Sequence, residues 1–309
     1  MPELPEVETI RRQLAPAVEG RRLVRFEVLD PRWCEPLAPQ ALADAVLGRE
    51  VERLVRHGKY LDWQLSGEIH LLMHLRMTGT LLLEAGPPSG RTLRTEGQAG
   101  EPPPYARVRI EFDDLKNLWL SDPRRFGTGQ LVVGDAELER FVAARLGIEP
   151  FDERFGGAHL RSLAKGRRGP IKSFLLDQRN LAGVGNIYAD EALFAAGVHP
   201  RRAAGSLTGK QYALLADAIR DVLAAGIDSQ GASIDDFRHL DGARGSFQDR
   251  FNVHRREGEP CPRCSRPIEK IVVGGRGTYV CRHCQPVPRA ARPRAARRAD
   301  RTGRPRRAR

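Results

Sequence analysis

The order of apolar and polar positions divides the chain into a β-rich first part and a helical second part. Between about residues 21 and 133, short runs rich in β-branched and aromatic residues are separated by Gly, Pro and Asp, which is typical of a β-sandwich or barrel. From about residue 135 onward, apolar residues recur with the period of a helix. We therefore predict an α+β protein, with strands at 23–29, 60–65, 69–75, 80–84, 107–112, 117–120 and 130–133 and helical periodicity clearest at Leu214, Leu215, Ala218, Ile219, Val222 and Leu223.

The N-terminus is expected to form a short amphipathic helix at residues 6–15, because Val7, Ile10 and Leu14 follow Pro5 at helical spacing. Residues 86–104 are rich in Gly, Pro, Thr and charged side chains and are interpreted as a mobile surface loop. The expected organisation is a β-sandwich domain at 2–134, a helical domain at 135–250, a four-cysteine ribbon at 251–285 and a basic tail at 286–309.

The charge of the chain is concentrated in its tail. The 309 residues carry a formal net charge of +12, and residues 286–309 hold ten arginines against one aspartate, a charge of +9 that leaves +3 for the first 285 residues. The tail has few apolar residues to bury, so we expect it to be disordered and to add non-specific affinity for phosphates at most. No apolar run approaches 18 residues and the N-terminus is charged, so we expect a soluble, cytoplasmic protein.

Four cysteines are spaced as zinc ligands. Two Cys-x-x-Cys pairs are separated by sixteen residues, which brings two knuckles onto one tetrahedral ion. Four thiolates leave no open position, so we expect one structural zinc that staples a two-stranded ribbon around residues 266–280. Disulfides fit an intracellular chain poorly, and His283 is an alternative ligand. The fifth cysteine, Cys34, is expected to be a partly buried small residue, and the ligands are Cys261, Cys264, Cys281 and Cys284.

Pro2 is a candidate nucleophile. Removal of Met1 would give it a free secondary amine, which condenses with an aldehyde-level carbon to form an iminium ion. An α-amino group titrates at roughly 7.7–8.0, so part of it is unprotonated at neutral pH. Glu3 and Glu6 lie within one helical turn and could serve as its acids. A Met-Pro start also occurs in proteins without such chemistry, so other motifs must support this hypothesis.

Those motifs resemble the formamidopyrimidine-DNA glycosylase family. The resemblance rests on five ordered segments over residues 2–284, namely Pro-Glu-Leu-Pro-Glu-Val-Glu-Thr at 2–9, His-Gly-Lys-Tyr-Leu at 57–61, Asp-Pro-Arg-Arg-Phe-Gly at 122–127, Gly-Val-Gly-Asn-Ile-Tyr-Ala at 183–189 and the four-cysteine ribbon. It implies a base-excision repair enzyme that removes 8-oxoguanine and formamidopyrimidines from duplex DNA and nicks the abasic strand by β,δ-elimination. It also implies a helix–two-turn–helix in the helical domain.

The resemblance assigns a role to each candidate residue. Pro2 would attack C1′, Glu3 would protonate the opening sugar oxygen, Glu6 would steady the N-terminal turn, and Lys59 would hold a phosphate near the reaction centre. A base must be flipped out before such an attack, so wedges must fill the vacated stack. The family pattern implies wedges at Met77, Arg124 and Phe126 and phosphate contacts at Asn186 and Arg276.

Each of these residues also has a simpler explanation. Met77 and Phe126 would be core residues, Asn186 a helix cap, Lys59 a solvated charge, and Arg276 an exposed charge beside a tight turn.

Three positions depart from the family pattern. Tyr105 stands where a histidine is frequent, Arg76 replaces a more usual glycine beside the wedge, and the loop at 226–247 is divergent. Two alternatives therefore stay open. One is the related endonuclease VIII-type branch, which prefers oxidised pyrimidines but typically has glycine at the position of Leu4. The other is a catalytically silent zinc-ribbon DNA-binding protein, which has no need of Pro2 and its acids. We expect a monomer that binds damaged double-stranded DNA.

Overall fold

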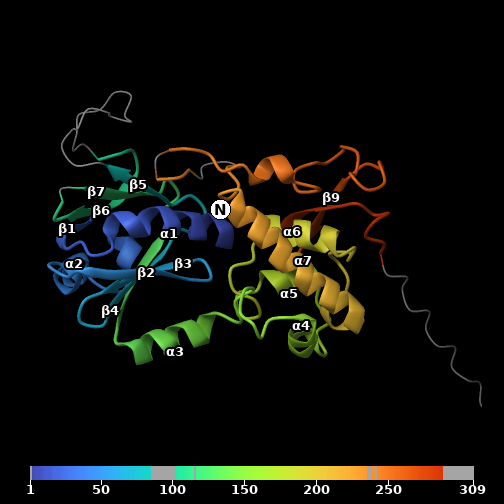
Figure 1. Cartoon of the computed structure of the whole chain (residues 1–309), viewed down its shortest axis with the longest axis horizontal. Coiled ribbons are helices and arrows are strands. Elements are labelled where there is room, and N and C mark those ends of the chain that lie inside the picture. The colour runs from blue at the N-terminus through green and yellow to red at the C-terminus, as the bar shows by residue number, and fades with distance from the viewer. Residues whose placement is uncertain (1, 85–101, 115, 235–237, 241, 288–309) are drawn as a thin grey trace, which may run out of the picture.

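The structure is a computed structural model that describes residues 2–84, 102–114, 116–234, 238–240 and 242–287. A β-rich part and a helical part lie side by side, and the N-terminus lies where the two parts meet (Figure 1). The predicted loop at 86–104 and the predicted tail at 286–309 fall outside the described residues, except for 102–104 and 286–287.

The β-rich part is a sandwich of two four-stranded antiparallel sheets, with strand orders β1-β6-β7-β5 and β2-β3-β4-β8. All seven predicted strands are confirmed. The eighth strand, β2, and the helix α2 (Pro39–Val46) were missed. The strands are β1 (Leu23–Val28), β2 (Val51–His57), β3 (Tyr60–Leu65), β4 (Ile69–His74), β5 (Thr80–Glu84), β6 (Ala106–Phe112), β7 (Asn117–Ser121) and β8 (Thr128–Val133).

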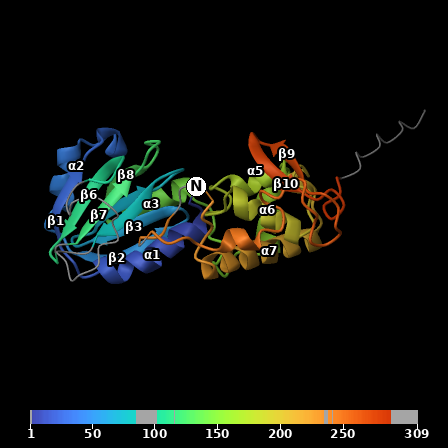
Figure 2. The ribbon, with the colours of Figure 1, turned by 90° about the horizontal axis from the view of Figure 1, so that it is seen from above.

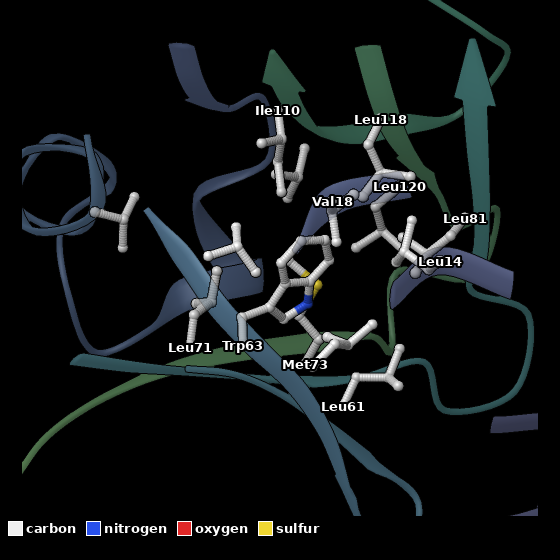
Figure 3. Packing of buried hydrophobic residues seen from close by; sticks show 14 of the residues in the cluster. Leu14, Val18, Leu61, Trp63, Leu71, Met73, Leu81, Ile110, Leu118 and Leu120 are labelled. Atoms are coloured by element: carbon white, nitrogen blue, oxygen red, sulfur yellow. The ribbon is translucent and has the colours of Figure 1, made fainter. Parts of the chain in front are cut away.

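Apolar side chains from both sheets and from the first helix fill the core of the sandwich (Figure 3). Trp63 of β3 lies at its centre and is fully buried, and its ring stacks against Phe112 of β6 with centroids 6.4 Å apart. Leu14 and Val18 reach the same core from the first helix. This burial fixes the first helix against the sheets, because it removes a large apolar area from water.

The first helix, α1 (Leu4–Val18), is longer than the predicted 6–15 at both ends. At its start, Glu3 and Glu6 form a capping box, which satisfies backbone N–H groups that a helix otherwise leaves free. At its end, Pro16 costs one hydrogen bond, but the fully buried Val18 keeps the last turn against the core. Leu4 belongs to the core of the helical part, whereas Val7 belongs to that of the sandwich, so α1 joins the two.

The helices α4 to α7 build the helical part, and α6 and α7 pack together at its centre, whereas α3 packs against β8 of the sandwich. On α7, Leu215, Ala218, Ile219 and Leu223 are buried as the periodicity predicts, whereas Leu214 is 47% exposed. Among the described residues, every helix is too short or too polar to cross a membrane. The helices are α3 (Asp135–Arg145), α4 (Gly157–Ala164), α5 (Ile171–Leu176), α6 (Asn186–Ala195) and α7 (Gly209–Asp228).

The C-terminal ribbon consists of β9 (Glu269–Val273) and β10 (Arg276–Val280), which pair antiparallel. Gly274 and Gly275 form the turn with φ of 57° and 74°, the left-handed region that favours glycine. The ribbon lies against α5 and α6 (Figure 2). The ribbon turn is therefore held in place by the packing of its strands against these helices.

Candidate active site

The N-terminal turn is held by backbone hydrogen bonds at the junction of the two parts. The Glu3 N–H donates to Oε2 of Glu6 at 2.8 Å, and the Leu4 N–H donates to the carbonyl of Gly183 at 3.0 Å. Pro2, directly before these residues, is buried. The predicted nucleophile thus sits on a fixed turn between the sandwich and the helices.

Glu3 places its carboxylate on the N-terminus of α6. It accepts the backbone N–H groups of Ile187 at 3.0 Å and Tyr188 at 3.4 Å. Free N–H groups and the helix dipole at this end both favour a negative charge. Gly185 permits the approach, since a Cβ atom there would lie 2.1 Å from Cδ of Glu3.

Glu6 is buried behind Glu3 and is fully hydrogen-bonded. Its Oε1 accepts the Tyr188 hydroxyl at 2.7 Å and the Ala232 N–H at 2.8 Å. Burial raises the pKa of Glu6, the neighbouring Glu3 carboxylate raises it further, and these hydrogen bonds oppose the shift. The expected role of steadying the N-terminal turn agrees with this geometry, which also ties the turn to the segment after α7.

Lys59 lies in the β2–β3 turn and is only 6% exposed. Its Nζ donates to the carbonyl of Val184 at 2.9 Å, in the loop that leads to α6. Burial lowers the pKa of Lys59, Glu3 and Glu6 oppose the shift, and Arg276 adds to it. The structure thus brings Lys59 to the two glutamates, and its ammonium is shielded rather than solvated.

The three expected wedge residues lie on two neighbouring turns. Met77 is half-buried in the β4–β5 turn, whereas Arg124 and Phe126 are exposed in the β7–β8 turn. Asp122 joins the turns, since it accepts the Thr78 hydroxyl at 2.5 Å and the backbone N–H of Phe126 at 2.9 Å.

The exposed surface of these turns carries a cation and a ring together. The guanidinium of Arg124 lies 4.7 Å from the ring centroid of Phe126, whose residue is 50% exposed. Phe126 is therefore not a core residue, which removes the simpler explanation for it. The Arg124 guanidinium and the Phe126 ring are paired on a turn that Asp122 holds by hydrogen bonds, an arrangement that suits insertion between bases.

Asn186 and Arg276 come together at the ribbon turn. Asn186 begins α6, and its Nδ2 donates to the carbonyl of Gly277 at 3.1 Å. Lys172 donates to the same carbonyl at 3.1 Å. Arg276, the residue before it, is exposed. Both predicted phosphate contacts thus lie on one edge, where a helix N-terminus meets the first residue of β10.

The four predicted metal ligands converge. Their Sγ atoms all lie within 4.8 Å of one another, and His283 is exposed and outside the cluster. Four sulfur donors at this separation fit a closed tetrahedral zinc site. Cys34 is buried, and its thiol donates to the Leu37 carbonyl. The converging cysteines are Cys261, Cys264, Cys281 and Cys284.

The positions that depart from the family pattern have unusual backbones. Arg76 and Tyr105 both have positive φ, 54° and 61°, and both are exposed. Tyr105 accepts the Asp122 N–H through its carbonyl at 3.0 Å, so it borders the turn that carries the expected wedges. Within the divergent 226–247 segment, Ala232 pairs with Ser246, which closes the base of the loop.

Sequence reasoning missed several residues of this site. Tyr188 was only part of a motif, although it holds Glu6. Thr78 and Asp122 were missed as the link between the wedge turns. His74 was missed as well: burial and the nearby Arg76 and Lys59 lower its pKa to about 3, and its Nδ1 accepts the Arg76 N–H. Tyr188 and Asp122 carried a signal, since both stand in the family motifs at 183–189 and 122–127.

Comparison with known proteins identifies the family. Residues 1–129 match the formamidopyrimidine-DNA glycosylase N-terminal domain, residues 146–238 its H2TH domain, and residues 258–287 the zinc finger found in FPG and IleRS. A formamidopyrimidine-DNA glycosylase of Ruegeria pomeroyi is 43% identical over 289 residues, covering 92% of this chain and 100% of the relative. The chain belongs to the formamidopyrimidine-DNA glycosylase family, a class of DNA glycosylases with abasic-site lyase activity.

Solved structures agree with this assignment. The MutM (Fpg) protein of Thermus thermophilus superposes with a TM-score of 0.79 at 40% identity, over 92% of this chain and 98% of that one. A Lactococcus lactis Fpg mutant in complex with DNA that contains Fapy-dG gives 0.82 at 34% identity, over 93% and 100%. The sandwich, the helix–two-turn–helix and the zinc finger of the predicted fold are confirmed.

Tyr188→Phe tests the buried Glu6 contact. Loss of the hydroxyl should lower the free energy of unfolding by about 1–3 kcal/mol. The hydrogen bond lowers the pKa of Glu6, so its loss moves that pKa further above the ordinary 4.5. A buried acid with a raised pKa destabilises the folded protein as pH increases and the acid ionises. The difference in the free energy of unfolding between parent and variant should therefore be larger at about pH 8 than at about pH 4.

Urea unfolding at both pH values measures this difference. Tyr60→Phe is the matched control, because its ring packs on His74 while the described residues offer its hydroxyl no hydrogen bond. An equal loss of stability at the two pH values would contradict the assignment of Glu6 as the group that titrates.

Proposed function

We propose that this chain removes oxidised purines from duplex DNA through a Schiff base at Pro2 and then cleaves the abasic strand. The observation that carries the proposal is the meeting of the N-terminal turn with Lys59. The Glu3 carboxylate, from the turn before α1, and the Lys59 ammonium, from the β2–β3 turn, both bind the segment 184–188 of the helical part. Pro2 directly precedes Glu3, which supports a site in which the proposed nucleophile, acid and cation act beside this segment.

In the proposed reaction, the unprotonated amine of Pro2 attacks C1′ of the damaged nucleotide. The N-glycosidic bond breaks and the base departs with its electron pair, while Glu3 gives a proton to the ring oxygen as the sugar opens. The resulting iminium acidifies C2′–H. Loss of that proton expels the 3′ phosphate, and a second elimination expels the 5′ phosphate. Both ends of the gap then carry phosphate.

Supporting residues have separate roles in this proposal. Glu6 holds the turn that bears Pro2 and Glu3, and Lys59 provides positive charge beside the reacting sugar and its phosphate. Met77, Arg124 and Phe126 fill the stack that the flipped nucleotide leaves. Asn186 and Arg276 bind the phosphates on either side, which positions the strand without reading its sequence.

The cysteine cluster would hold one zinc ion with a structural role. When bound, the metal stabilises the ribbon fold, and the ribbon in turn presents Arg276. The chemistry is assigned to residues 2–134, DNA binding mainly to 135–250, the metal to 251–285 and accessory charge to 286–309. We expect a monomer that acts in the cytoplasm, at the chromosome.

Cleavage of defined duplexes tests the substrate class. We expect incision of duplexes with 8-oxoguanine or a formamidopyrimidine, with phosphate at both ends of the gap, and little incision of undamaged DNA. Preference for an oxidised pyrimidine would move the protein to the endonuclease VIII-type branch. Binding without incision of any duplex would identify a silent DNA-binding protein.

Glu3→Gln is the matched variant for this assay, because glutamine can still accept the N–H groups of α6 but cannot deliver the proton. Base release should slow by about 10²–10⁴-fold, while affinity for an abasic-site analogue stays close to that of the parent. Equal loss of both would assign Glu3 to binding instead.

The metal proposal predicts one zinc per chain by mass spectrometry of metal content. Cys281→Ser should lose the ion and weaken DNA binding by roughly tenfold, because the ribbon no longer supports Arg276. His283→Ala should keep the ion, since this exposed side chain lies outside the cluster. Loss of zinc in the histidine variant, or full binding in the cysteine variant, would contradict the proposal.

A further inference from the structure

One carboxylate from the helical side holds the turn that carries Lys59. Glu149 lies in the segment between α3 and α4, and its Oε1 accepts the Gly58 N–H. Both of its oxygens also accept Nη1 of Arg56, at 3.1 and 2.9 Å. The same Nη1 donates to the carbonyl of Gly58 at 3.0 Å. The ion pair therefore occupies both backbone groups of the residue before Lys59.

Arg56 is shared between two carboxylates. Its Nε donates to Oε2 of Glu8 on α1 at 3.2 Å. The side chains of Arg56 and Glu8 are 13% and 11% exposed, and that of Glu149 is 31% exposed. Exposed ion pairs contribute little because water screens them, whereas a shielded guanidinium between two carboxylates holds its geometry more firmly.

The β2–β3 turn packs closely against the loop before α6. A Cβ atom at Gly58 would lie 3.4 Å from both Cβ of Ala182 and the backbone N of Gly183, and the φ of Gly58 is 57°. Ile148, next to Glu149, accepts the Ala182 N–H at 3.0 Å. The segment that carries Glu149 and the loop 182–184 are thus hydrogen-bonded to each other. Lys59 reaches from the β2–β3 turn to Val184 in this loop.

We propose that Glu149 and Arg56 form an ionic clamp that positions Lys59 at the junction of the two domains. Both are positioning residues that act through Gly58, and they keep the lysine against the Val184 carbonyl and away from water. The catalytic meaning of Lys59 rests on the proposed function. The clamp itself is a property of the free protein and is tested without DNA.

The test is the rate at which a pulse of acetic anhydride acetylates Lys59 in the free full-length protein, read by peptide mass spectrometry. Glu149→Gln keeps the size of the side chain and an oxygen for Gly58 but loses the charge that binds Arg56. We expect Lys59 to react about tenfold faster relative to the exposed Lys210, because a charged hydrogen bond contributes at least that factor. Arg56→Gln should give the same increase.

Two controls separate the clamp from general loosening. Lys172 is fully buried in the helical part and should stay unreactive in every variant. Asp152→Asn removes a carboxylate of the same linker that pairs with Arg154 and, among the described residues, forms no hydrogen bond or ion pair with the turn. It should therefore leave the labelling of Lys59 unchanged. Unchanged labelling in Glu149→Gln would overturn the proposal, as would a parallel rise at Lys172.

Single-turnover kinetics then connect the clamp to the chemistry. Both clamp variants should slow base release at saturating DNA by a larger factor than they weaken affinity for an abasic-site analogue. The double variant should be no slower than the slower single variant, because the two residues act as one unit. Faster labelling with unchanged base release would support the clamp and contradict the proposed role of Lys59, so the two failures are distinguishable.

Discussion

The hydrogen bonds between the Glu3 carboxylate and the N-terminus of α6 are the contact on which the architecture of the site depends. These hydrogen bonds fix the start of α1. The body of α1 packs into the core of the sandwich, while Leu4 at its start enters the core of the helical part. The N-terminal turn is therefore the point at which two cores are joined. A nucleophile at Pro2 acquires a defined position from this contact, although chain termini are usually among the least ordered positions of a protein.

Burial gives this junction its electrostatic character. It raises the pKa of Glu6 and lowers that of Lys59, so both groups hold their charges less firmly than they would in water. Such groups persist only where hydrogen bonds satisfy them, and here the partners are two backbone groups and a tyrosine hydroxyl, all from the helical part. The same desolvation strengthens any interaction with a developing charge on a sugar.

Much of the fold could be predicted from the sequence, because apolar alternation and helical spacing are local. The strand β2 was missed because its pairing with β3 shifts register between Val51 and Arg53, which blurs the alternation. The cysteine ligands and the candidates from Pro2 to Arg276 came from spacing and family motifs. The contacts of Tyr188, Asp122 and Glu149 could not be predicted from the sequence, since each joins positions at least 44 residues apart that only the packing of the fold brings together.

The most direct test of the account is borohydride reduction of the protein on a duplex with 8-oxoguanine, followed by mass spectrometry of the trapped peptide. The account predicts an adduct at the amine of Pro2, in chains that have lost Met1, and a weaker one on undamaged DNA. An adduct at Lys59 instead would contradict the assignment of Pro2 as the nucleophile. No adduct from protein that begins at Pro2 would contradict covalent catalysis.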